Sequence, residues 1–209
     1  IDNSNTCSTI VEVRDEIRPA CIAPSNILMN CTEVDENLPE DLNLAFATDP
    51  FSTTALLDQM FGTSLGVDNC MVVDSTQTVL DNRNSCGAGT IIRSFSYTDA
   101  VGFASQNNCM QRITLLELHD YSIVFPADAE SPSCLEPNYS GLSFEALGCD
   151  LITTNSTIDT FQATAVECDK LRISYEVINW CEYDTESDAY SVPRDADDDD
   201  ILDEITVLH

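Results

Sequence analysis

The stretch IIRSFSYTDAVGFASQNNCMQRITLLEL, residues 91–118, decides the fold class because it holds two runs of alternating side chains around a polar turn. One side of the first run carries Ile91, Arg93, Phe95 and Tyr97. After the turn at residues 102–108, the same alternation returns in Cys109, Gln111, Ile113 and Leu115. A period of two, with β-branched and aromatic residues, is typical of half-buried strands. The stretch therefore predicts a β-hairpin.

The composition indicates a globular protein with an acidic surface. With 209 residues and 43% hydrophobic content, the chain can form one large or two ordinary domains. It carries 37 acidic and 8 basic residues, a net charge of -29. Nucleic acid and anionic membrane surfaces would repel such a chain, so we expect it neither to bind nucleic acid nor to insert into a membrane. Cations and basic surfaces are the partners that this charge favours.

The cysteines predict disulfides and an oxidising compartment. An even number of them is scattered along the chain, at Cys7, Cys21, Cys31, Cys70, Cys86, Cys109, Cys134, Cys149, Cys168 and Cys181. No C-x-x-C pair occurs, and only His119 and His209 could assist as metal ligands, which argues against zinc. We expect an extracellular or cell-surface protein. The alternative is a cytosolic protein with buried free thiols.

No apolar run reaches the ~20 residues of a membrane helix, and the chain does not open on a signal peptide. We therefore expect a mature chain or a segment of a longer one.

Two parts of the sequence repeat in the same order. CGAGTIIRSFSYTDAVG, from Cys86, and CDKLRISYEVINWCEYD, from Cys168, each lead through a polar gap into an alternating strand that ends at Asp99 or Asn179. We predict two homologous β domains, residues 20–118 and 119–209. Residues 1–19 would be the last strand of a preceding repeat or an N-terminal extension.

The first predicted domain carries an insertion, residues 38–62. Its apolar residues Leu56, Leu57, Met60 and Phe61 are compatible with one short helix. Because the insertion is the largest difference between the two copies, we expect a partner contact there.

The motif residues carry a resemblance to a known family. They are Cys86, Ile91, Arg93, Phe95, Tyr97, Asp99, Cys109, Gln111, Ile113 and Leu115, with Asn179, Trp180 and Cys181 in the second copy. Together they resemble the HYR-like, immunoglobulin-like tandem repeats of very large secreted surface proteins of gliding Bacteroidota (Saprospira-type). Such repeats usually have a cysteine two residues after the Asp. Cys181 keeps it in the second copy, whereas Val101 replaces it in the first.

The resemblance implies an all-β fold of two tandem immunoglobulin-like β-sandwich domains, stapled by disulfides. For the pairing we predict Cys31 with Cys70, Cys86 with Cys109, Cys134 with Cys149, Cys168 with Cys181, and Cys7 with Cys21. Spacing alone does not determine connectivity.

The segment PRDADDDDILDE, residues 193–204, is the candidate metal site. Its carboxylates are Asp195, Asp197, Asp199, Asp200, Asp203 and Glu204, and oxygen ligands at alternate positions can surround Ca²⁺. The pattern resembles D-x-D-x-D-G loops, except that Asp200 stands at the glycine position. The alternative is a solvated acidic loop.

Three classes of function follow. We expect a non-enzymatic structural or adhesive module of a cell-surface fibre or appendage, whose partners are copies of itself or neighbouring repeats. The alternative is a ligand- or carbohydrate-binding accessory module of a secreted protein. A hydrolase would need a catalytic set that the sequence does not display: no G-x-S-x-G motif occurs, and both histidines lie apart from any such pattern. A pair of carboxylates could still serve a hydrolase.

Overall fold

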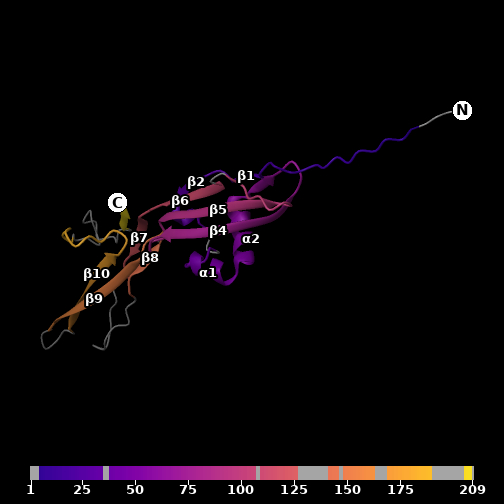
Figure 1. The fold of residues 1–209 in the computed structure, drawn as a ribbon. Coiled ribbons are helices and arrows are strands. Elements are labelled where there is room, and N and C mark those ends of the chain that lie inside the picture. Colours follow the sequence, from indigo (N-terminus) through magenta and orange to yellow (C-terminus); the bar gives the residue numbers. More distant parts are fainter. Residues whose placement is uncertain are drawn as a thin grey trace. The chain divides into compact units, whose positions relative to one another are not determined.

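The predicted hairpin is confirmed in the computed structural model. Its strands are β5 (Gly89–Asp99) and β6 (Cys109–Leu116), which lie side by side in a four-stranded sheet of order β2-β6-β5-β4 (Figure 1). The alternation of side chains sets which face is buried, because successive residues of a strand point to opposite faces. The side chains with no exposure on this face are Ile91, Arg93, Gln111 and Ile113.

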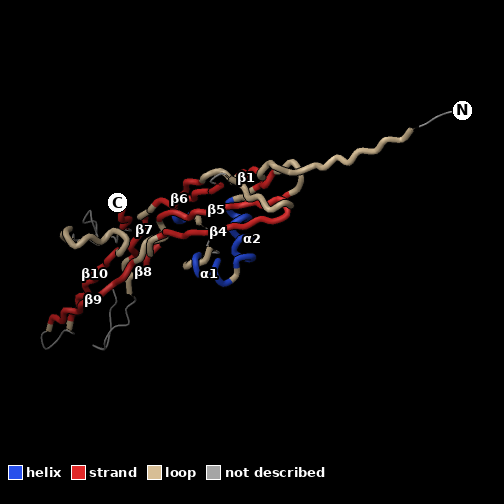
Figure 2. Tube along the Cα trace, in the orientation of Figure 1, coloured by secondary structure: helices blue, strands red, loops and turns tan. Residues whose placement is uncertain are grey.

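The structure describes residues 5–34, 38–106, 109–126, 141–145, 148–162, 169–189 and 205–208. Strands dominate these ranges, and the α-helices fall between residues 42 and 61 (Figure 2). The remaining strands are β1 (Ala20–Ile22), β2 (Ile27–Asn30), β3 (Leu65–Val67), β4 (Val72–Arg83), β7 (Asp120–Val124), β8 (Ser143–Glu145), β9 (Ile152–Phe161), β10 (Lys170–Asn179) and β11 (Ile205–Leu208). A short 3-10 turn, η1 (Cys31–Glu33), follows β2. Within the described ranges, no helix is long and apolar enough to span a membrane.

The chain forms two compact units. Unit 1 comprises Ile1–Ile27, Leu38–Asp81 and Ile91–Ile113, and unit 2 comprises Leu28–Asn37, Asn82–Thr90 and Thr114–His209. Unit 1 contains the antiparallel β1-β3 pair and most of the four-stranded sheet. Unit 2 contains the long β9-β10 hairpin and a three-stranded sheet of order β11-β7-β8. The immunoglobulin-like form of the domains, and their boundary between residues 118 and 119, stay predictions.

Each unit has its own apolar core. In unit 1, Phe95 packs with the Cys21–Cys109 pair and with Tyr97. In unit 2, Tyr121 and Ile123 of β7 are buried, and partly buried side chains of β8, β9 and β10 pack against them. Strands from different sheets therefore share one core in each unit, which is how sheets stabilise one another.

The insertion forms two helices, so the expectation of one short helix was wrong in number. They are α1 (Leu42–Thr48) and α2 (Pro50–Phe61). Asp49 ends the first helix and caps the second, since its carboxylate accepts from the Ser52 N–H at 3.0 Å. Pro50 begins α2, at a position where its missing N–H costs nothing. Asp49, the one residue between the helices, therefore ends α1 and caps the beginning of α2.

A buried arginine fastens α2 to the sheet. Arg93 of β5 donates to the Gly62 carbonyl at 2.8 Å and forms an ion pair with Asp58 of α2. It also donates to Gln111 of β6 at 2.9 Å, and its guanidinium lies 5.0 Å from the centre of the Phe95 ring. Burial, which outweighs the Asp58 charge, lowers the pKa of Arg93 from its ordinary value. The motif arginine is therefore an internal anchor of the fold.

The disulfides differ from the predicted pairs. They join Cys21 to Cys109, Cys31 to Cys149, and Cys86 to Cys181, with Cα atoms 5.8, 6.0 and 5.8 Å apart. The predicted pairs that these bonds exclude are Cys31–Cys70, Cys86–Cys109, Cys134–Cys149, Cys168–Cys181 and Cys7–Cys21. Cys7 and Cys70 are free and exposed, and Cys134 and Cys168 lie outside the described residues.

Strand length explains why sequence neighbours do not pair. Cys86 precedes β5 and Cys109 opens β6, so the two lie toward opposite ends of an 11-residue strand, about 36 Å long. A disulfide requires Cα atoms within roughly 7 Å. The three bonds place the protein in an oxidising compartment.

Candidate functional site

Among the described residues, each unit has one cluster of carboxylate and histidine side chains close enough together to hold a metal ion. The aspartate cluster of unit 1 consists of Asp15, Asp68 and Asp99. The histidine cluster of unit 2 consists of His119, Asp150 and Glu182, together with the amide of Asn179. In both clusters, each titratable residue has a potential ligand atom within 4.8 Å of those of the other two.

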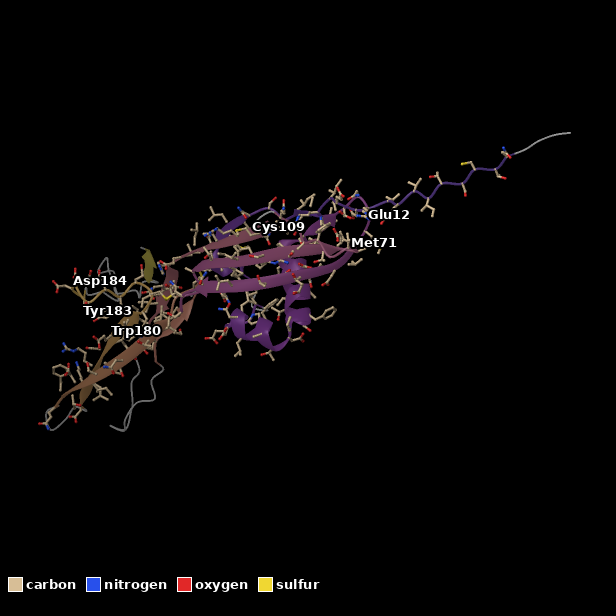
Figure 3. The ribbon with its side chains drawn as sticks, viewed as in Figure 1. Glu12, Met71, Cys109, Trp180, Tyr183 and Asp184 are labelled. Carbon is tan, nitrogen blue, oxygen red and sulfur yellow. A yellow bond between two sulfur atoms is a disulfide. The ribbon has the colours of Figure 1, made fainter. Side chains whose placement is uncertain are left out.

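The strands bring the three aspartates together. The antiparallel register pairs Ala20, the first residue of β1, with Val67, the last residue of β3. The segment before β1 and the residue after β3 therefore lie at the same end of this strand pair. Asp15 belongs to that segment, and Asp68 follows β3 directly. Asp99 is the last residue of β5. Figure 3 labels Glu12 and Met71, which lie on the segments that carry Asp15 and Asp68.

Each aspartate uses one carboxylate oxygen to close its own turn. Oδ1 of Asp99 accepts from the N–H groups of Val101 and Phe103 at 2.9 and 2.8 Å. Oδ2 of Asp68 accepts from two backbone N–H groups, at 3.0 and 3.1 Å, and Oδ1 of Asp15 accepts from one at 3.1 Å. These turns are typical of aspartate, whose short side chain reaches backbone donors a few residues ahead. They fix the orientation of each carboxylate.

The second oxygen of each carboxylate has no donor. Oδ2 of Asp15, Oδ1 of Asp68 and Oδ2 of Asp99 are buried atoms without a hydrogen-bond partner. The Asp99 side chain is the most enclosed of the three, because the residue is only 1% exposed. Within the described ranges, none of the three forms an ion pair with a basic side chain. A buried carboxylate oxygen without a donor is unfavourable.

Mutual repulsion adds to this cost. Two unit charges about 5 Å apart repel each other by roughly 3 kcal/mol at an effective dielectric constant of about 20. The thiol of Cys70 lies in the same negative field: desolvation raises its pKa most, followed by a side-chain hydrogen bond to Asp15 and then by the charges of Asp15, Asp68 and Asp99. The aspartate cluster is therefore a site of concentrated negative charge.

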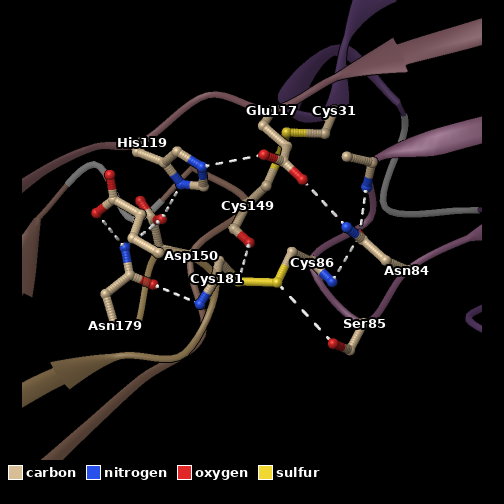
Figure 4. Close-up of polar contacts among 12 residues, drawn as sticks. Cys31, Asn84, Ser85, Cys86, Glu117, His119, Cys149, Asp150, Asn179 and Cys181 are labelled. Atoms are coloured by element: carbon tan, nitrogen blue, oxygen red, sulfur yellow. Dashed lines mark hydrogen bonds and ion pairs between the residues drawn. A yellow bond between two sulfur atoms is a disulfide. The ribbon is translucent and has the colours of Figure 1, made fainter. Parts of the chain in front are cut away.

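The histidine cluster is largely balanced by its own donors (Figure 4). Nδ1 of His119 lies 2.6 Å from Oδ1 of Asp150, and its Nε2 lies 3.5 Å from Glu117. The amide nitrogen of Asn179 donates to both Asp150 and Glu182, at 2.8 Å each. Oδ2 of Asp150 has no partner, although this side chain is fully buried.

The surroundings of His119 favour its charged form. Burial acts to lower the pKa of His119, but the hydrogen bonds to Asp150 and Glu117 and the charges of Glu182 and Asp150 outweigh burial and raise it. The His119 ring and the Asn179 amide thus supply donors that these carboxylates need.

The two clusters are built around the same kind of turn. Asp99 ends β5 and Asn179 ends β10, and each accepts from the N–H two residues ahead, at 2.9 and 3.1 Å. In both turns the backbone carbonyl of the capping residue accepts from the third residue ahead, at 3.2 Å. Asp99 and Asn179 were aligned in the predicted repeat. Their chemistry differs, since only the Asn179 amide can donate to a neighbouring carboxylate.

The predicted metal site cannot be compared with these clusters. Its residues, Asp195, Asp197, Asp199, Asp200, Asp203 and Glu204, lie outside the described ranges, so the acidic loop stays a prediction. Asp99 was predicted to end a strand, whereas Asp15 and Asp68 were not predicted to belong to a site. The signal for those two is weak, because each is an isolated aspartate in a chain with 37 acidic residues.

No protein-family model, no curated protein and no solved structure matches this chain. The assignment of function therefore rests on the geometry of the two units and of their clusters.

Proposed function

We propose that this chain is a non-enzymatic structural or adhesive module of an extracellular fibre or appendage on the cell surface. The observation that carries the proposal is the set of three long-range disulfides, whose cysteines are 88, 118 and 95 residues apart. Each bond closes a loop of about half the chain, so the unfolded state loses much of its freedom. A module that transmits tension benefits because its cross-linked strands cannot separate fully.

The bond between Cys21 and Cys109 illustrates the arrangement. Cys21 lies on β1 and Cys109 on β6, so the bond joins the small sheet of unit 1 to its four-stranded sheet. Both cysteines are buried against Phe95. A pull on the chain before β1 would be carried by this covalent link to β6, at the centre of the larger sheet.

The surface charge is consistent with an extracellular module. A net charge of -29 keeps copies apart except where specific contacts or cations overcome the repulsion. In salty media this repulsion is screened beyond ~8 Å, so a fibre could still form through short-range contacts. Partners would be neighbouring repeats or other copies of the chain.

Immunogold electron microscopy tests the proposal. Antibodies raised against the folded, oxidised chain are applied to intact cells that make the protein, and to permeabilised cells as a control for access. We expect gold particles along fibres or appendages on the outside of intact cells. Label that appears only after permeabilisation, or protein found only in the culture medium, would contradict a surface structural role.

One observation favours the alternative, a carbohydrate-binding module. Trp180 and Tyr183 are 49% and 54% exposed and form an edge-to-face pair with ring centres 5.6 Å apart (Figure 3). Sugar rings stack on exposed aromatic rings, since Trp and Tyr combine an apolar face with a polar N–H or O–H group. A glycan array probed with the chain and with Trp180→Ala distinguishes the two functions: the binding module predicts a signal that the substitution removes.

A further inference from the structure

We propose that the aspartate cluster of Asp15, Asp68 and Asp99 binds one Ca²⁺ ion and thereby fixes the segment before β1 to the turns that follow β3 and β5. The site differs from the predicted acidic loop in residues 193–204. It does not depend on the proposed surface role, because it is carried by the geometry of unit 1 alone.

The first support is the set of oxygens without donors. Three carboxylates are held by backbone N–H groups so that each retains one buried oxygen without a partner. Asp99 is the strongest indication, because a carboxylate that is 1% exposed has little access to solvent to satisfy its Oδ2. A cation among the three would neutralise their repulsion and satisfy these oxygens together.

The spacing allows one cation, and the ligand type favours Ca²⁺. The three ligand atoms lie within 4.8 Å of one another. Oxygens on opposite sides of Ca²⁺ are separated by up to about 5 Å, so one ion can contact all three. Ca²⁺ also accepts irregular coordination completed by water and backbone carbonyls, which suits three turns on separate strands.

Unit 2 provides an internal comparison. At the corresponding turn, Asn179 replaces Asp99, and its amide donates to Asp150 and Glu182 at 2.8 Å. His119 supplies a further donor to Asp150. Unit 1 lacks the amide at this position, because Asp99 is a carboxylate. A bound cation would balance the carboxylates of unit 1, as the donors from Asn179 and His119 balance those of unit 2.

The position of Asp15 gives the ion a mechanical consequence. Residues 5–14 are exposed and belong to no strand, and Asp15 is the first partly buried residue after them. A cation shared by Asp15, Asp68 and Asp99 would join the incoming chain to two turns of unit 1. Calcium would thereby set the direction in which the preceding segment leaves the unit.

Isothermal titration calorimetry of the full 209-residue chain tests the site. The chain is stripped with a chelator and titrated with Ca²⁺, and separately with Mg²⁺, up to ~10 mM, since extracellular modules bind Ca²⁺ with Kd values of about 0.1 to 1 mM. Asp99→Asn and Asp68→Asn keep the size of the side chain and an oxygen for the turn. Asp15→Asn serves if either of these fails to fold, as judged by circular dichroism. The matched control replaces Asp195, Asp197 and Asp199 with Asn.

We expect Asp99→Asn and Asp68→Asn to weaken Ca²⁺ binding at one site at least tenfold, as loss of a charged ligand predicts. The loop control should keep that site, and Mg²⁺ should bind it more weakly. Wild-type affinity in the cluster variants would overturn the proposal. So would loss of all binding in the loop control, tighter binding of Mg²⁺ than of Ca²⁺, or no binding of Ca²⁺ up to ~10 mM. None of these results would alter the gold labelling of cells, so the two proposals fail separately.

Discussion

Arg93 of β5 donates a hydrogen bond to Gln111 of β6 across 2.9 Å, and neither residue is exposed to solvent. The network continues from Gln111, whose amide donates to the carbonyls of Ser25 and Phe61 at 2.8 Å each. A polar pair in the middle of a β core thus fixes both the chain before β2 and the end of α2. The core of unit 1 therefore contains a hydrogen-bonded polar pair in addition to its apolar side chains.

Replacing Arg93 with Met should destabilise the protein strongly. The substitution leaves the Gln111 carbonyl oxygen and the Gly62 carbonyl without a donor and Asp58 without its cation. Breaking a buried ion pair from one side costs about 3–5 kcal/mol of unfolding free energy. Urea denaturation measures the loss. The control is Arg172→Met, which breaks an exposed ion pair with Asp159 and should cost less than about 1 kcal/mol. Equal losses in the two variants would refute the anchoring role of Arg93.

Removing the bond between Cys86 and Cys181 should lower the stability of unit 2. The double substitution to serine opens a loop whose ends are 95 residues apart, and we expect a loss of about 2–5 kcal/mol. Thermal unfolding under oxidising conditions measures it. Cys7→Ser is the matched control, since Cys7 is free and exposed and should change nothing measurable. A double variant as stable as this control would contradict the connectivity.

Stability should decrease as pH rises past neutrality, through His119. Its pKa is raised in the folded protein, because the hydrogen bond to Asp150 and the nearby carboxylates outweigh its burial. A raised folded pKa means that the stabilisation is complete below the unfolded value of about 6.5 and is lost as pH increases through the folded pKa.

Urea denaturation between about pH 5.5 and 9 measures this dependence. His119→Gln should flatten the curve in this range. A wild-type curve that is already flat, or that rises with pH, would show that folding does not raise the pKa of His119.

The periodic residues allowed the central hairpin to be predicted, but not the clusters. Ile91, Arg93 and Phe95 alternate with polar neighbours, and burial of one face follows directly from that period. The pairing of Cys21 with Cys109 could not be predicted, because it depends on which strands of two sheets meet in the core. Local spacing carries no information about a contact over 88 residues.

The aspartate cluster illustrates the same limit. Asp15, Asp68 and Asp99 lie before β1, after β3 and at the end of β5, and only the sheet register brings them together. The acidic run at residues 193–204 is far more conspicuous in the sequence. That run was predicted as the metal site because its acidic residues are close together in the sequence. Buried oxygens without donors, in contrast, can be recognised only in the three-dimensional structure.

Asn179→Asp is expected to convert the histidine cluster into one that responds to cations. The amide of Asn179 donates to Asp150 and Glu182, and a carboxylate in its place removes both hydrogen bonds and adds a third negative charge. Because Asn179 is only 9% exposed, solvent cannot replace the lost donors fully. We expect the calcium-free variant to lose about 1–3 kcal/mol of unfolding free energy.

Added Ca²⁺ should restore part of that loss, because three carboxylates would then surround the position left by the amide. Urea denaturation with Ca²⁺ and with a chelator measures the difference between variant and wild type. Gln59→Glu is the control, since it changes an exposed amide on α2 into a carboxylate without touching either cluster. If Ca²⁺ stabilises Asn179→Asp no more than wild type, a carboxylate at this turn does not confer cation dependence. The difference between Asp99 and Asn179 would then no longer support a cation in unit 1. If the variant does respond, the choice between Asp and Asn at the end of the long hairpin strand determines whether a unit of this kind is stabilised by a cation or by its own side chains.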